Sequence, residues 1–149
     1  MTAEQNKAIV RRWYKDMFER GNLNLAEELF TTDFISHDTS GPGPKGEWPR
    51  GPSGPRAVVK TYHDAFPDMH YSIDDLICEG DRVVVRWTAR GTNTGPIMDM
   101  PATGKAVTIS GIETDRLVNG KIAEAWVNFD LLSLLTQVGI VSTQNQSGR

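Results

Sequence analysis

Residues 110–139, SGIETDRLVNGKIAEAWVNFDLLSLLTQVG, decide the fold because they join a β-hairpin to a helix. Asn119-Gly120 separates two strand-like runs, and this pair tolerates the positive φ angles that a type I′ hairpin turn requires. The apolar residues from Leu131 to Val138 follow directly and predict a short helix. The stretch therefore predicts two antiparallel strands, the second of which leads into a helix.

The two-residue turn also predicts which side chains share a face of the hairpin. Counting outward from the turn pairs Asp115 with Glu124 and Glu113 with Trp126. The period of two then gathers acids and one indole on one face: Glu113, Asp115, Glu124, Trp126, Asn128 and Asp130. The opposite face is mostly apolar: Ile112, Ala123, Ala125, Val127 and Phe129. Like charges on one face repel one another, so we expect the acidic face to be solvated, paired or used.

Length and composition predict a single domain over residues 1–149, ordered over about 2–141, with a flexible tail at 142–149. The net charge of -3 and a pI of about 5.6 give no basic field, so we expect no nucleic-acid or membrane partner. Cys78 is the only cysteine, which fits a reducing compartment. No apolar run reaches the length of a membrane span, and we predict a cytoplasmic protein.

Helical signals come first along the chain and β signals second. Thr2 and Gln5 form a capping box before an amphipathic helix that ends near Gly21. Asn24 starts a shorter helix, and Ser53 caps a third. Strand patterns cover residues 33–38, 70–80, 81–95, 105–117 and 121–130. This order predicts an α+β fold with the helices packed on one side of a mostly antiparallel sheet.

Residues 39–55 are rich in proline and glycine and cannot form regular structure. A loop of this length in a compact domain is often functional. Trp48 lies within it, where no helix or strand buries the ring. We therefore expect Trp48 to cover the mouth of a cavity as part of a lid.

A series of motifs runs in order along the chain: NKAIVRRWY, FISHD, GPSGP, AFPDMHYSIDDLICEGDRVVVRWTARGTNTG, MPATGKAVTISGI, NGKIAEAW and LLSLLTQVG. In order and spacing they resemble the SnoaL-like polyketide cyclases, or ester cyclases, of the nuclear-transport-factor-two-like cone fold. The resemblance implies a conical α+β barrel, in which a curved, mostly antiparallel sheet carries three N-terminal helices on its concave side. It also implies a homodimer, a deep apolar pocket for a hydrophobic small molecule, and no metal or organic cofactor.

The resemblance further implies an intramolecular aldol condensation that closes a ring of a polyketide methyl ester, with an Asp abstracting an α-proton. That Asp belongs directly after Trp126, where this chain has Val127, and the His that accompanies it matches Glu113. A His common in the GTHTG turn of relatives is replaced by Asn93. The family's constellation is therefore absent, and other groups have to supply any acid or base.

Three residues remain as candidates for catalysis, and each has a structural alternative. Asp130 can act as a base or cap the last helix. Glu113 can be a pocket base beside Trp126, or an outer-face residue paired with an arginine of a neighbouring strand. His37 can donate to a substrate carbonyl or hold the backbone of the loop.

Substrate contacts are predicted from the helices, the long loop and the strands: Tyr14, Phe18, Trp48, Tyr62, Phe66, Arg86, Met98, Trp126 and Asn128. The helical aromatic residues are core by default, and a pocket is the part of that core left unfilled. Arg86 could bind a substrate carboxylate, although a salt bridge to Asp74 or Glu113 is the favoured alternative.

The leading hypothesis is a cofactor-independent enzyme that applies general acid/base chemistry to a hydrophobic, carbonyl-bearing small molecule. A second is a ligand-binding module that kept the cone and lost the base, as Val127 suggests. A third is epoxide hydrolysis or isomerisation on the same scaffold.

Overall fold

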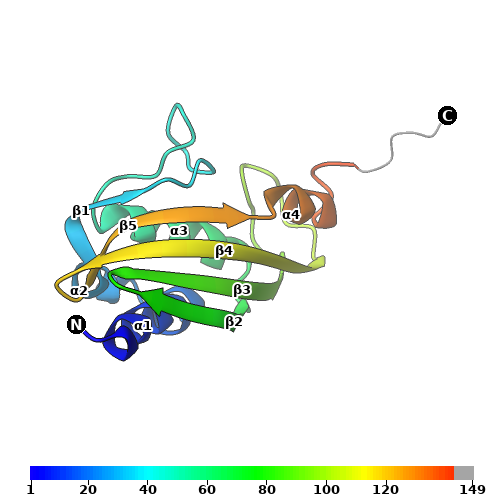
Figure 1. Cartoon of the computed structure of the whole chain (residues 1–149). Helices are drawn as coiled ribbons and strands as arrows, with labels where there is room; N and C mark the ends of the chain where they lie inside the picture. The colour runs from blue at the N-terminus through cyan, green and yellow to red at the C-terminus, as the bar shows by residue number, and fades with distance from the viewer. Residues whose placement is uncertain (143–149) are drawn as a thin grey trace.

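A curved, five-stranded sheet forms the centre of the molecule (Figure 1). The computed structural model describes residues 1–142 and contains strands β1 (Phe30–Ser36), β2 (His70–Glu79), β3 (Arg82–Thr92), β4 (Ala106–Val118) and β5 (Lys121–Phe129). They lie in the order β1-β5-β4-β3-β2, and every neighbouring pair is antiparallel except β1 and β5. The predicted α+β class is confirmed, and the sheet stays open between β1 and β2. The predicted tail lies, apart from its first residue, outside the described residues.

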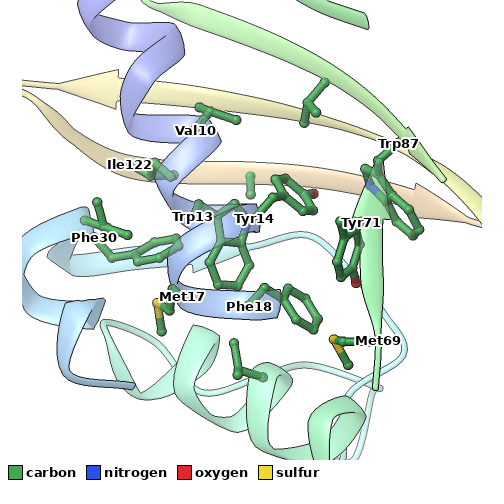
Figure 2. Packing of buried hydrophobic residues seen from close by; sticks show 14 of the residues in the cluster. Val10, Trp13, Tyr14, Met17, Phe18, Phe30, Met69, Tyr71, Trp87 and Ile122 are labelled. Carbon is green, nitrogen blue, oxygen red and sulfur yellow. The ribbon is translucent and has the colours of Figure 1, made fainter. Parts of the chain in front are cut away.

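The helices supply the aromatic interior. The chain forms α1 (Ala3–Arg12), the π-helical turns η1 (Trp13–Glu19), the short η2 (Leu23–Leu25), α2 (Ala26–Leu29), α3 (Ser53–Ala65) and α4 (Leu131–Gln137). The capping box that starts α1 is confirmed. Along η1 the buried residues are Trp13, Tyr14, Met17 and Phe18, which meet the side chains of the sheet (Figure 2).

Two predicted helix starts are wrong. No side chain caps α2, because the 3₁₀ turn at Leu23–Leu25 leads into it and Asn24 lies inside that turn. Ser53 is the first residue of α3 rather than its cap. Pro52 holds the cap position with φ -59°, and its ring fixes this helix-compatible angle.

The hairpin turn is confirmed, but the register beyond it is wrong by one residue. Asn119 and Gly120 have φ angles of 48° and 81°, as a type I′ turn requires. Leu117 pairs with Ile122 and Arg116 with Glu124, which leaves Ala123 as an extra residue on β5. This β-bulge was not foreseen, and Asp115 consequently lies opposite Ala125 and Glu113 opposite Val127.

Because of the bulge, the acids of β4 share a face with the apolar residues of β5 rather than with its polar ones. A slip of one residue moves every later side chain of a strand to the opposite face. Glu113 and Asp115, with exposed fractions of 5% and 0%, therefore share the inner face with the apolar side chains of β5. Asn128 is exposed on the other face. The predicted six-residue acidic face does not exist as one surface.

Gly111 of β4 is a point where packing tolerates no side chain. A Cβ placed there would lie 2.3 Å from Cζ2 of Trp87 and 2.8 Å from Cβ of Phe129. We expect Gly111→Ala to lower the free energy of unfolding by about 1–3 kcal/mol, because the buried indole has to move. Urea denaturation measures this loss, and Ser110→Ala, at the exposed neighbouring position, should stay within about 0.5 kcal/mol of the wild type. Equal stability of the two variants would contradict this packing.

Candidate functional site

An internal cavity lies between the helices and the inner face of the sheet. Its empty volume is about 680 Å³, including the part that opens to solvent. Aromatic rings form most of its wall and contact one another, with the centroid of Tyr71 lying 5.3 Å from that of Tyr14 and 4.9 Å from that of Phe18 (Figure 2). Such a wall suits a planar, apolar molecule.

Glu113 is a buried carboxyl group on this apolar wall. Trp13 donates from Nε1 to Oε1 over 3.1 Å, and Tyr14 donates from its hydroxyl to Oε2 over 2.7 Å. Burial raises the pKa of Glu113, while the neighbouring Asp115 and the hydrogen bonds from Tyr14 and Trp13 act in the opposite direction. Burial, and then the charge of Glu113, raises the pKa of Tyr14 well above its usual value, so this phenol remains a donor.

Asp115 lies two residues further along the same face of β4 and is fully buried. Within residues 1–142, no N–H or O–H group donates a hydrogen bond to either carboxyl oxygen of Asp115. Burial, followed by the charge of Glu113, raises the pKa of Asp115 well above its usual range. A hydrogen bond between the two carboxyl groups is possible only when one of them keeps its proton.

A second polar cluster closes another part of the cavity wall. Asp38 follows β1, and its Oδ2 accepts hydrogen bonds from Nε1 of Trp48 over 3.0 Å and from Oγ of Ser40 over 2.9 Å. Both Asp38 and Trp48 line the cavity, and Trp48 is 5% exposed. These bonds hold the loop between β1 and α3 against the cavity, and this loop projects beyond the β1 edge in Figure 1.

Two donors on the cavity wall have no acceptor among the described residues: the hydroxyl of Tyr62 and Nε1 of Trp87. Burial raises the pKa of Tyr62 to about 12, so the hydroxyl keeps its proton. Ser40 is close enough to lower the pKa of Tyr62, but it accepts no hydrogen bond from the hydroxyl. Both donor atoms are buried, so a ligand carbonyl reaches such a donor only when a neighbouring side chain moves.

The structure brings five of the predicted site residues together around the cavity: Tyr14, Phe18, Trp48, Tyr62 and Glu113. Phe66 lines an adjoining hollow that shares Tyr62 and Tyr71 with the main cavity.

The other predicted residues lie away from the cavity. Arg86, Asn128 and Asp130 line a hollow on the outer side of the sheet, where Arg86 pairs with Asp75 over 2.7 Å and Asp74 over 3.7 Å. Asp130 caps α4 by accepting a hydrogen bond from the backbone of Ser133 over 3.0 Å.

His37 and Trp126 stack on each other, with ring centroids 5.1 Å apart, and neither lines the cavity. His37 pairs with Glu124 over 2.7 Å, and Trp126 lies beneath Arg82. Met98 is 44% exposed in the loop between β3 and β4.

Sequence reasoning missed Trp13, Asp38, Asp115 and Trp87 as site residues. One signal for Asp115 was present, because Val107, Ile109 and Leu117 have the same parity along β4 and all three are apolar. This pattern places Glu113 and Asp115 on the buried face. Trp13 bonds to Glu113, 100 residues away, and no local pattern indicates this contact. For Asp38 and Trp87, the place on the cavity wall depends on how the loop and the sheet pack against the helices, which the local sequence does not indicate.

Two features are absent from residues 1–142. No helix there combines the length and apolarity needed to span a bilayer. No group of three or more His, Cys, Asp or Glu side chains is placed to hold a metal ion.

The cavity has the parts that proton transfer at carbon requires. Glu113 is a carboxyl group within an apolar wall, and its hydrogen bonds fix its orientation. In such surroundings a carboxylate can take a proton from a bound carbon acid, provided that water is excluded. The geometry therefore supports acid/base chemistry on a hydrophobic ligand.

Comparison with known proteins agrees with this architecture. IdmH from Streptomyces antibioticus, a candidate polyketide cyclase, is 31% identical over 91% of this chain and 99% of that chain, with a TM-score of 0.77. TsrD from Streptomyces laurentii is 25% identical over 95% of this chain and 99% of that chain, with a TM-score of 0.81. AclR from Streptomyces galilaeus, a candidate hydroxylase, shares the fold at 22% identity, with a TM-score of 0.80 over 97% of this chain and 87% of that chain.

No curated protein matches the sequence. The family of SnoaL-like polyketide cyclases does match it, over residues 8–138, and this range runs from within α1 to the residue that follows α4. The chain belongs to the SnoaL-like polyketide cyclase family.

Proposed function

We propose that this protein is a small cofactor-independent enzyme that removes a proton next to a carbonyl group of a hydrophobic molecule held in the cavity. An intramolecular aldol closure of the polyketide type is the reaction that fits its family and its likeness to IdmH. Of the three candidates from the sequence, Glu113 is the proposed base, because it lines the cavity and Asp130 and His37 do not.

The observation that carries this proposal is the position of Glu113 opposite Val127. The family's Asp would stand at Val127, on the neighbouring strand and also on the cavity wall. A carboxylate at Glu113 therefore reaches the same apolar space from the adjacent strand. Trp13 and Tyr14 orient it from the helical side.

The proposed reaction needs one base and one donor. Glu113 takes the α-proton, so that a C–H bond breaks and an O–H bond forms on its carboxyl group. The electron pair moves into an enolate, whose oxygen accepts a hydrogen bond from Tyr62 once the bound molecule has displaced the side chains that cover this hydroxyl. The enolate carbon attacks a second carbonyl of the same molecule, and the resulting alkoxide recovers the proton from Glu113. The carboxylate is regenerated, and the net change is a new C–C bond with the α-hydrogen moved to the oxygen of the attacked carbonyl, which becomes a hydroxyl group.

The experiment uses methyl benzoylacetate, an aromatic ketone with a methyl ester and acidic α-hydrogens. In D₂O the wild-type protein is expected to accelerate exchange of these hydrogens for deuterium above the rate in buffer and in the presence of heat-unfolded protein. Proton NMR follows the loss of the α-hydrogen signal. If the wild-type protein exchanges these hydrogens no faster than buffer or heat-unfolded protein does, the proposed base chemistry is contradicted.

Val127 specifically favours a second candidate, a protein that binds such ligands without transforming them. Under this alternative methyl benzoylacetate quenches the fluorescence of the cavity tryptophans, Trp13, Trp48 and Trp87, but its exchange stays at the buffer rate. Quenching without exchange would therefore replace the enzyme with a binding protein. Isomerisation begins with the same proton removal, and product analysis with longer substrates separates it from ring closure.

A further inference from the structure

The reaction described above leaves one buried acid, Asp115, without a task. It does not line the cavity, and its side chain is inaccessible to solvent. A fully buried carboxyl group without a donor is unfavourable when ionised, so its presence requires an explanation. The explanation has to come from the groups that surround it.

The surroundings of Asp115 are apolar on both neighbouring strands, with Val83 opposite it on β3 and Ala125 opposite it on β5. The titratable groups that interact with it are Glu113, on the same face of β4, and Tyr14 from η1. No lysine, arginine or histidine of residues 1–142 forms an ion pair with either carboxyl group. Two neighbouring carboxylates would therefore repel each other without a cation to compensate them.

The two carboxyl groups differ in their donors, and this difference indicates where a proton resides. Glu113 accepts one hydrogen bond on each oxygen, from Trp13 and from Tyr14. Asp115 accepts none from any N–H or O–H group of the described residues. A negative charge is more stable on the group with two donors, and a proton on the group without any.

We propose that Asp115 is a positioning residue that retains its proton in the resting protein and donates it in a hydrogen bond to Glu113, so that the pair carries one negative charge located on Glu113. Glu113 then has three donors, and a base can exist in an apolar cavity without a neighbouring cation. The effect of Asp115 on Glu113 as a catalytic base rests on the proposed function. In that reaction the Asp115 proton is not consumed, because Glu113 alone takes and returns the substrate proton.

The indole N–H of Trp13 reports the ionisation of Glu113 without any substrate, because it donates directly to that carboxyl group. Its ¹⁵N resonance is followed as a function of pH in the wild type, in Asp115→Asn and in Asp115→Ala. An amide at position 115 can still donate to Glu113, whereas alanine cannot. We expect the midpoint of Asp115→Asn to match the wild type, and that of Asp115→Ala to rise by about one pH unit.

Two results would overturn the inference. Midpoints that fall in both variants would mean that Asp115 is negatively charged in the resting protein. Midpoints that stay unchanged in both would mean that Asp115 does not act on Glu113. If Asp115→Ala does not fold, the wild type labelled with [¹³C]carboxyl aspartate tests the proposal instead. One aspartate resonance, identified by its absence from Asp115→Asn, should show a protonated carboxyl group at neutral pH. Ionisation of every aspartate at that pH would refute the proposal.

These spectra are independent of turnover. A failure of the deuterium-exchange experiment would remove the proposed function and leave the proton on Asp115 in place. Conversely, exchange by the wild type with no coupling between the two carboxyl groups would refute only the role of Asp115.

Discussion

Replacing Glu113 by glutamine is expected to slow the exchange of methyl benzoylacetate α-hydrogens by about 10²–10⁴-fold, the usual contribution of a positioned general base. The amide has the same shape and can still accept from Trp13, but it cannot take a proton from carbon. The fold should persist, because the substitution replaces a buried carboxyl group with an uncharged amide of the same shape. Proton NMR in D₂O measures the rate, and circular dichroism verifies the fold.

The matched control is Glu79→Gln, which makes the same chemical change at an exposed position at the end of β2. Its exchange rate should equal that of the wild type. If Glu113→Gln retained the full rate, the base would lie elsewhere, and Asp38 would be the remaining carboxyl group on the cavity wall.

The second large effect concerns stability and pH. The folded state holds the proton of Asp115 far above the pH at which the unfolded chain releases it, because the pKa of Asp115 is raised by burial and by Glu113. The stability associated with this proton is fully present below the unfolded pKa and is lost as pH rises toward the folded pKa. Asp115→Asn removes this dependence. The free energy of unfolding of the variant should therefore rise relative to that of the wild type by up to about 1.4 kcal/mol for each pH unit above about pH 4.

Comparing variant with wild type isolates this contribution. Carboxyl groups with lowered pKa, such as Glu19, which Lys15 and the Tyr71 backbone stabilise, contribute in the opposite direction in both proteins and cancel. Urea denaturation at several pH values provides the free energies. Asp33→Asn, at an exposed position of β1, should show no such trend. A constant difference between Asp115→Asn and the wild type across pH 4–8 would show that Asp115 is ionised in the folded protein.

Local signals predicted much of the fold. The capping box at Thr2 and the turn at Asn119-Gly120 depend on contacts within a few residues, and both formed as expected. Arg86 was predicted as a substrate contact and lies outside the cavity, but the alternative that the sequence offered, a salt bridge to Asp74, is present. These features need no information about distant parts of the chain.

The site was harder to predict because one residue reversed the inner and outer faces. Ala123 lies in a bulge, and a bulge depends on how both strands pack rather than on the turn residues alone. Without it Glu113 would lie opposite Trp126; with it Glu113 enters the cavity opposite Val127. His37 and Asp38 show the same sensitivity, since consecutive residues of an extended chain point to opposite sides and only Asp38 reaches the cavity.

The central claim is that the carboxylate of Glu113 is the base of this cavity, and one comparison tests it most directly. The pH dependence of α-hydrogen exchange is measured on the wild type beside the pH dependence of the Trp13 indole ¹⁵N resonance. Both should share one midpoint, because both report the same ionisation, and both transitions should disappear in Glu113→Gln. Exchange with a different midpoint from the Trp13 transition, or exchange that persists in Glu113→Gln, would contradict the assignment of Glu113 as the base.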